Sequence, residues 1–269
     1  HEKTGKPVVV LVDEYDKPLL QSFFNEELQD QMRNMLKAFY GMLKPMDEHV
    51  KFGFFTGVTK FSKVSVFSDL NNLDDITMWD EFSTLCGITE NEIHTQFDGE
   101  ITAMATKADI NKEECYVKLK EFYDGYHFCP GSEGVYNPFS LLTALKRRLF
   151  GSYWFETGTP SFLVEVMQES NYQLENLENE EATANILGSM DSINRTPIPL
   201  LFQSGYLTIK GYDNEFETYN LRFPNKEVSE GFSRYLLPYY SPINKGQEAF
   251  FVSNFVKELR NGQPEAFMK

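Results

Sequence analysis

The stretch that decides the fold is VVVLV at residues 8–12, followed at once by DEYDKP at residues 13–18. A short β-branched run bounded by a charged cluster is typical of a strand buried on both faces of a parallel sheet. In open α/β sheets, ligands bind at the carboxyl ends of such strands. We therefore expect the chemistry of this protein to lie on Asp13 and Glu14, directly after the run.

A second apolar run, VKFGFFT at residues 50–56, follows at a distance that leaves room for one helix. The intervening residues 26–44 place apolar side chains three and four positions apart, which predicts a helix with one apolar face, and Pro45 ends it. Strand, helix and strand form a βαβ unit, which requires a parallel sheet and a right-handed crossover. The carboxyl ends of the two strands then lie side by side, so Thr56 and Thr59 are expected within reach of Asp13 and Glu14.

Two adjacent carboxylates after a buried strand resemble a Walker B element, in which the first acid holds Mg²⁺ and the second activates the attacking water. On this interpretation Asp13 is the metal ligand, Glu14 is the catalytic base, and Thr56 or Thr59 contacts the γ-phosphate or the water. Asp16 and Lys60 join Asp13 as candidate cofactor-binding residues, and ATP with Mg²⁺ is the expected cofactor. The alternative is a strand followed by a polar turn whose threonines satisfy the turn backbone, because acids after strands are common in α/β proteins.

Composition restricts the possible classes of protein. The 269 residues (31.2 kDa) are 41% apolar, enough for one large domain or two ordinary ones. No run approaches the ~18 apolar residues of a membrane-spanning helix, and no secretory leader is recognisable, so we expect a cytoplasmic protein with no membrane partner. The three cysteines lack metal-binding spacing and are expected to be buried free thiols.

The net charge of −15 is concentrated in the middle of the chain. Residues 149–194 contain eight Asp or Glu and no Lys or Arg. Since phosphate contacts depend on Lys and Arg, nonspecific nucleic-acid binding by this surface is not expected. A solvated acidic face is the simpler interpretation.

Beyond Asp80 the alternating pattern gives way to helical signals. Thr89 with Glu92 forms a capping-box pattern, Asn111 is a cap, and Asn137-Pro138 and Thr159-Pro160 are start signals. The sequence therefore predicts four parts: a partial ATPase-like core over residues 1–80, a helical lid-like region over 81–194, a module over 195–245, and the start of a linker helix or next domain over 246–269.

The module over residues 195–245 has a characteristic order of elements. A short helix at residues 200–203 precedes two strands, at residues 205–210 and 218–223, joined by a polar turn, and Asn225 caps a further helix. Helix, hairpin and helix predict a winged-helix-like module. Its few cations are diluted by glutamates, so packing against the ATPase core is expected rather than DNA binding.

The motifs together resemble a known bacterial family. VVVLVDEYDKPL at residues 8–19 and FFTGVTKFSKVSVFSDLNNLDDIT at residues 54–77 are similar to AAA-ATPase-like proteins with a C-terminal PD-(D/E)XK nuclease-like region. YDGYHF (123–128), VYNPFSLL (135–142), YWFETGTPSFL (153–163), LLFQSGYLTI (200–209) and FPNKEV (223–228) agree with it. The resemblance implies an α/β fold followed by mostly α: part of a RecA/AAA-like P-loop NTPase sheet, a helical region and a winged-helix-like module.

Two features depart from that family. No G-x-x-x-x-G-K-[ST] phosphate-binding loop occurs in these 269 residues, since Gly5-Lys6-Pro7 lacks both the leading Gly and the Ser/Thr. The nuclease-like region is expected after Lys269. We therefore expect the chain to be a piece of a longer protein, whose missing P-loop segment and nuclease-like region are its partners, and to bind ATP weakly or not at all by itself.

Three functions remain open at this point. The first is part of an ATP-binding and hydrolysing AAA-like protein coupled to a nuclease-like effector. The second is a non-hydrolysing regulatory or protein-interaction module on a degenerate ATPase scaffold. The third and least supported is direct DNA binding by the hairpin module.

Overall fold

The computed structural model describes residues 5–60, 66–67, 70, 72–154, 161–170, 172, 180–188 and 196–240. The chain divides into two compact units. The first contains residues 1–85, 127–133 and 166–222, and the second contains residues 86–126, 134–165 and 223–269. Within the described residues, no helix is long and apolar enough to cross a membrane.

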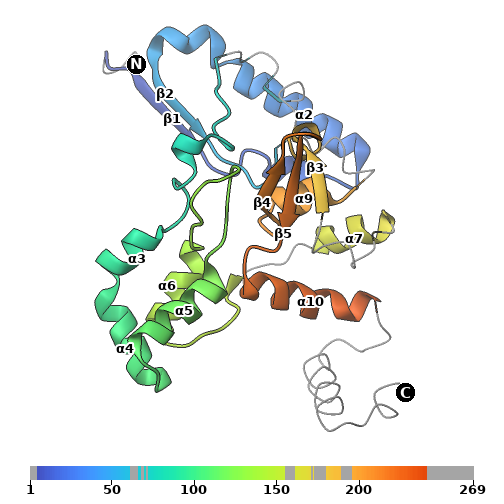
Figure 1. Cartoon of the computed structure of the whole chain (residues 1–269). Coiled ribbons are helices and arrows are strands. Elements are labelled where there is room, and N and C mark those ends of the chain that lie inside the picture. Colours follow the sequence, from blue (N-terminus) through green and yellow to red (C-terminus); the bar gives the residue numbers. More distant parts are fainter. Residues whose placement is uncertain are drawn as a thin grey trace. The chain divides into compact units, whose positions relative to one another are not determined.

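The first unit begins with two parallel strands, β1 (Val8–Val12) and β2 (Val50–Phe55), which run side by side in Figure 1. Between them the chain forms α1 (Lys17–Gln21), α2 (Glu26–Gly41) and the 3₁₀ helix η1 (Lys44–His49). The side chain of Asn25 caps α2 by accepting a hydrogen bond from the Leu28 amide at 3.0 Å. The predicted strand–helix–strand unit and its parallel pairing are confirmed.

The predicted burial of β1 on both faces is wrong for the described structure. Val9 and Leu11 are 51% and 69% exposed, as is Phe52 of β2 at 54%, whereas the alternating Val10 and Val12 are half-buried. Side chains alternate between the faces of a strand, so one face is partly covered and the other is open. The physical reason is that this sheet has only two strands among the described residues, and a parallel sheet is buried only where further elements cover both faces.

A second sheet of the first unit is antiparallel, with the strand order β3 (Glu180–Thr183), β5 (Thr218–Arg222), β4 (Thr208–Asp213). The helices α8 (Ala184–Leu187) and α9 (Ile198–Gln203) precede the hairpin, and η2 (Asp80–Phe82) lies earlier in the chain. The predicted short helix and hairpin are confirmed, although the first strand of the hairpin lies at Thr208–Asp213 instead of residues 205–210. The strand β3, which pairs with β5, was not predicted from the sequence.

The second unit is helical: α3 (Glu90–Gln96), α4 (Asp98–Ala108), α5 (Lys112–Tyr123), α6 (Pro138–Arg147) and α10 (Lys226–Tyr240). Its core is a cluster of buried side chains from α3 to α6 together with Tyr136 and Tyr153. The cysteines are free thiols, and Cys115 and Cys129 are buried as expected, but the prediction of burial is wrong for Cys86, which is exposed. The helix α7 (Ser161–Glu169) spans the division between the units.

The capping signals of the second unit are confirmed where the structure describes them. Thr89 forms a reciprocal capping box with Glu92, and Asn111, Asn137 and Asn225 each accept a backbone hydrogen bond at the start of a helix. The start signal at residues 159–160 and the predicted linker helix at 246–269 lie outside the described residues.

Candidate functional site

The carboxyl ends of β1 and β2 stay joined beyond the regular strands. The amide of Thr56 donates to the Val12 carbonyl at 2.8 Å, and the amide of Tyr15 donates to the Thr56 carbonyl at 2.9 Å. This places the Thr56 hydroxyl against Asp13, and its Oγ1 donates to Asp13 Oδ1 at 2.5 Å. The neighbourhood that the parallel pairing predicted for Asp13 and Thr56 is therefore present in the structure. Asp13 is exposed and Thr56 is half-buried, so the pair is open to a ligand.

Glu14 has an unusual backbone conformation. Its φ of +53° lies in the left-handed region, which non-glycine residues rarely adopt and which is often found at functional sites. The side chain is exposed and pairs with Lys17, whose Nζ lies 2.6 Å from Glu14 Oε2. The hydrogen bond to Glu14 raises the pKa of Lys17, and the charges of Glu14 and Asp13 add to that effect. Glu14 thus lies beside Asp13 in sequence with its carboxylate held by a cation.

Asp16 and Thr59 form a second pair, and it is buried. Asp16 is fully inaccessible to solvent, and Thr59 is 3% exposed. Thr59 Oγ1 and the Thr59 amide both donate to Asp16 Oδ2 at 2.6 Å, and the amide of Val58 donates to Asp16 Oδ1 at 3.1 Å. The structure therefore does not bring the Thr59 hydroxyl to Asp13, and it places Asp16 beneath the loop rather than on the exposed side of the site.

Lys60 is held in an ion pair with Asp75. Burial opposes ionisation of Asp75, but hydrogen bonds from Lys60 and Thr77 outweigh it and lower the pKa of Asp75 below its ordinary value. The amide of Lys60 also donates to Oε1 of Gln203 in α9 at 2.6 Å. Both the side chain and the backbone of Lys60 are therefore engaged by the first unit itself.

The side chains at the strand ends are oxygen donors of the kind that can hold Mg²⁺. Asp13 and Glu14 offer carboxylates, and Thr56 offers a hydroxyl. Within the described part of the chain, no three His, Cys, Asp or Glu side chains gather in a way that would enclose a metal ion. Mg²⁺ is commonly held by one or two carboxylates together with waters and substrate phosphates, which is the arrangement that this donor set allows.

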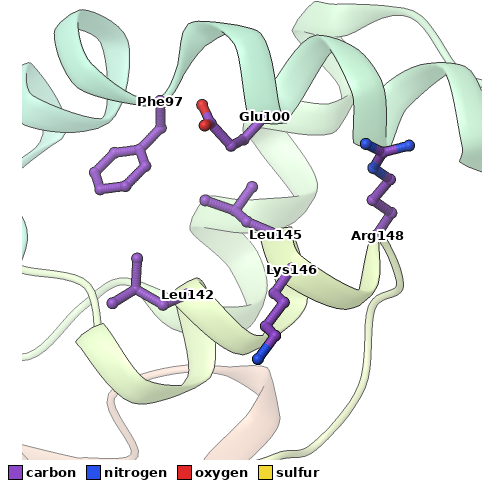
Figure 2. Close-up of a pocket in the computed structure, with 6 residues that line it drawn as sticks. All are labelled: Phe97, Glu100, Leu142, Leu145, Lys146 and Arg148. Carbon is purple, nitrogen blue, oxygen red and sulfur yellow. The ribbon is translucent and has the colours of Figure 1, made fainter.

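A shallow pocket of about 320 Å³ lies in the second unit, around the start of α4 and the end of α6 (Figure 2). Figure 2 shows the residues that line it: the apolar side chains of Phe97, Leu142 and Leu145, and the charged side chains of Glu100, Lys146 and Arg148. None of the predicted site residues lines this pocket. The candidate site at the strand ends is therefore distinct from it.

Two residues that shape the site, Tyr15 and Gly57, were not among the predicted site residues. The hydroxyl of Tyr15 donates to the Thr59 carbonyl at 3.1 Å. A Cβ on Gly57 would lie 2.6 Å from Asp16 Oδ1 and 2.7 Å from the Tyr15 ring, so only glycine fits there without displacing a neighbour. Gly57 could have been recognised from its position after the second apolar run, because a glycine there often marks a point where another part of the chain lies close to the backbone. Nothing in the sequence marked Tyr15.

One curated relative has 40% identity to this chain over 244 residues: "Uncharacterized protein in vnfD 5'region" from Azotobacter chroococcum mcd 1. The match covers 90% of this chain and 45% of the relative, so the chain spans about half the length of the curated protein it matches. No solved structure matches the chain. Residues 1–67 match a family model described as "AAA-ATPase_like: Predicted AAA-ATPase". The matched residues include both parallel strands, and the match supports an AAA-ATPase-like character for this part of the protein.

Proposed function

We propose that the first unit supplies the Walker B half of an ATP-hydrolysing site in a larger AAA-ATPase-like protein. The observation that supports this most directly is the 2.5 Å hydrogen bond between Thr56 and Asp13, formed where two parallel strands end side by side. The match of residues 1–67 to a predicted AAA-ATPase family supports it independently.

Each residue at the strand ends has a proposed role. Asp13 holds Mg²⁺, directly or through water, and Thr56 fixes the orientation of the Asp13 carboxylate by donating to Oδ1. Glu14 orients the attacking water and takes its proton, a role that requires the carboxylate to leave Lys17. While it donates to Asp13, the Thr56 hydroxyl can also accept a hydrogen bond from the attacking water, whereas donation to the γ-phosphate requires it to leave Asp13. Mg²⁺, when bound, neutralises the developing charge on the phosphates.

The phosphate-binding loop of this site comes from outside the 269 residues, because no G-x-x-x-x-G-K-[ST] occurs within them. ATP, Mg²⁺, the P-loop segment and the nuclease-like effector are therefore partners proposed for the whole protein. Coupling of hydrolysis to that effector rests on the family resemblance.

The test is ATP turnover by the whole protein and its Glu14→Gln variant. The variant keeps the size of the side chain but removes the base, so we expect turnover to fall by about 10²–10⁴-fold. Glu26→Gln is the matched control, because Glu26 is also an exposed glutamate of the first unit but lies at the start of α2. Equal turnover in the wild type and Glu14→Gln would remove Glu14 from the mechanism.

The alternative is a non-hydrolysing interaction module on the same scaffold. The open apolar face of the parallel sheet, with Val9, Leu11 and Phe52 exposed, favours this second function. The same assay separates the two functions, because robust turnover by the whole protein excludes a non-hydrolysing scaffold.

A further inference from the structure

The Asp16 carboxylate is buried, and it accepts hydrogen bonds from the short loop that follows β2. Its two oxygens accept three hydrogen bonds, from the amides of Val58 and Thr59 and from the Thr59 hydroxyl. A buried carboxylate is costly unless donors compensate for the lost water, and hydrogen bonds to a charged group are stronger than neutral ones. These three donors satisfy Asp16, and they fix the loop that follows β2.

Tyr15 holds the same loop at two further points. Its amide donates to the Thr56 carbonyl, and its hydroxyl donates to the Thr59 carbonyl. Gly57 lies between these points and leaves no room for a Cβ against Asp16 and Tyr15. Backbone and side-chain bonds therefore fasten residues 56–59 to residues 15–16 from both ends.

Thr56 is the first residue of the fastened loop, and its hydroxyl is the one that reaches Asp13. The two threonines consequently have different positions. The Thr59 hydroxyl is buried and used by Asp16, whereas the Thr56 hydroxyl lies on the accessible side with Asp13. A loop that shifted would move Thr56 relative to Asp13 and Glu14.

We propose that Asp16 is a positioning residue of the ATP site: by accepting hydrogen bonds from Val58 and Thr59 it clamps the loop of residues 56–59 and so holds the Thr56 hydroxyl against Asp13. This inference rests on the proposed function. It gives Asp16 a role beneath the site in place of cofactor binding, and it selects Thr56 over Thr59 as the threonine that faces the nucleotide.

Loss of the clamp should lower kcat more than it raises KM for ATP. The phosphate-binding loop that dominates nucleotide affinity lies elsewhere, whereas Thr56 and Asp13 act at the reacting phosphate. A small misplacement at the reacting centre can cost about 10²-fold in rate. We expect kcat to fall about 10–100-fold, with KM changing by less than about threefold.

The experiment uses the whole protein and measures kcat and KM for the wild type, Asp16→Asn, Thr59→Val and Thr59→Ser. Thr59→Val removes only the hydroxyl bond, and Thr59→Ser restores it, so the serine variant should recover most of the wild-type kcat. Thr106→Val in α4 is the matched control, because Thr106 is exposed and its Oγ1 donates to the Thr102 carbonyl of the same helix. Should Asp16→Asn fail to fold, the Thr59 pair decides the result.

Hydrogen exchange on the same proteins tests the clamp without using activity. The amides of Val58 and Thr59 donate to Asp16, so they should be protected from exchange in the wild type. In Asp16→Asn they should exchange at least tenfold faster. In Thr59→Val, which loses only the hydroxyl bond to Asp16, they should exchange moderately faster. If the wild-type protein is active and Asp16→Asn and Thr59→Val have the same kcat as the wild type, the positioning role is overturned. Inactive wild-type protein would overturn the proposed function and the positioning role with it, while exchange would still show whether Asp16 holds the loop.

Discussion

Replacing Gly57 with alanine tests the packing beneath the candidate site with a single methyl group. The added Cβ would lie 2.6 Å from Asp16 Oδ1, 2.7 Å from Tyr15 Cε1 and 2.9 Å from Tyr15 Cδ1. All three distances are well below van der Waals contact. The φ of Gly57 is outside the left-handed region, so the expected cost is steric and comes from the neighbours that must move.

The magnitude follows from what those neighbours do. Forcing an extra methyl group into a filled space costs about 1–3 kcal/mol. Moving Asp16 or Tyr15 also weakens one or more of their hydrogen bonds to the loop, each worth about 1 kcal/mol. We expect Gly57→Ala to lower the free energy of unfolding of the first unit by about 2–4 kcal/mol, by adding the steric cost to one lost hydrogen bond.

The assay is urea unfolding followed by fluorescence in a Trp154→Phe background. The chain has two tryptophans, and Trp79 belongs to the first unit whereas Trp154 belongs to the second, so the remaining signal reports the first unit. Gly99→Ala, read by circular dichroism, is the matched control. Nothing lies within 4 Å of a Cβ at Gly99 in α4, so alanine there should raise stability by about 0.5–1 kcal/mol. Unchanged stability in Gly57→Ala would refute the packing described for the loop.

The remaining predictions concern the second unit. Glu227 is fully buried, and its Oε1 accepts hydrogen bonds from the amides of Tyr153 and Trp154 at 2.5 and 2.8 Å. Burial raises the pKa of Glu227 above its ordinary 4.5, so the folded state binds a proton that the unfolded state releases, and stability falls as pH rises from 4.5 through the raised value. In Glu227→Gln, the free energy of unfolding measured in urea should fall less between pH 4.5 and 7. If it falls as steeply as in the wild type, the pH dependence comes from other groups. Thr89→Ala removes one half of the α3 capping box and should cost about 1 kcal/mol in thermal or urea unfolding, with Thr95→Ala on the exposed face of α3 as the control. Equal stability of the two alanine variants would contradict a stabilising cap.

Helix caps could be predicted because they depend on residues close in sequence. The capping box of Thr89 and Glu92 and the caps at Asn111 and Asn137 each join groups three residues apart. Such contacts form whenever the segment is helical, whatever surrounds it. The strand β3 had no comparable signal, because Glu180–Thr183 is short and half acidic and becomes a strand only by pairing with β5.

The candidate site could be predicted only in part. Parallel pairing was enough to bring the ends of two strands together, and it placed Thr56 beside Asp13. It did not decide which of two threonines would meet which of two aspartates, because that depends on the exact register and on how the loop turns after Phe55. Asp16 and Thr59 are 43 residues apart, and neither residue type nor spacing indicated that they would bond.

The sequence by itself determined the βαβ order, the parallel pairing, the helix caps and the hairpin, since hydrophobic period and capping chemistry act over a few residues. Only the tertiary structure decided that Asp16 is buried on Thr59, that Thr56 is the threonine at Asp13, and that one face of β1 is open. Burial and long-range hydrogen bonds depend on which surfaces meet. An apolar run such as Val8–Val12 indicates that a strand can be buried by other elements. Whether it is buried depends on the elements that pack against it.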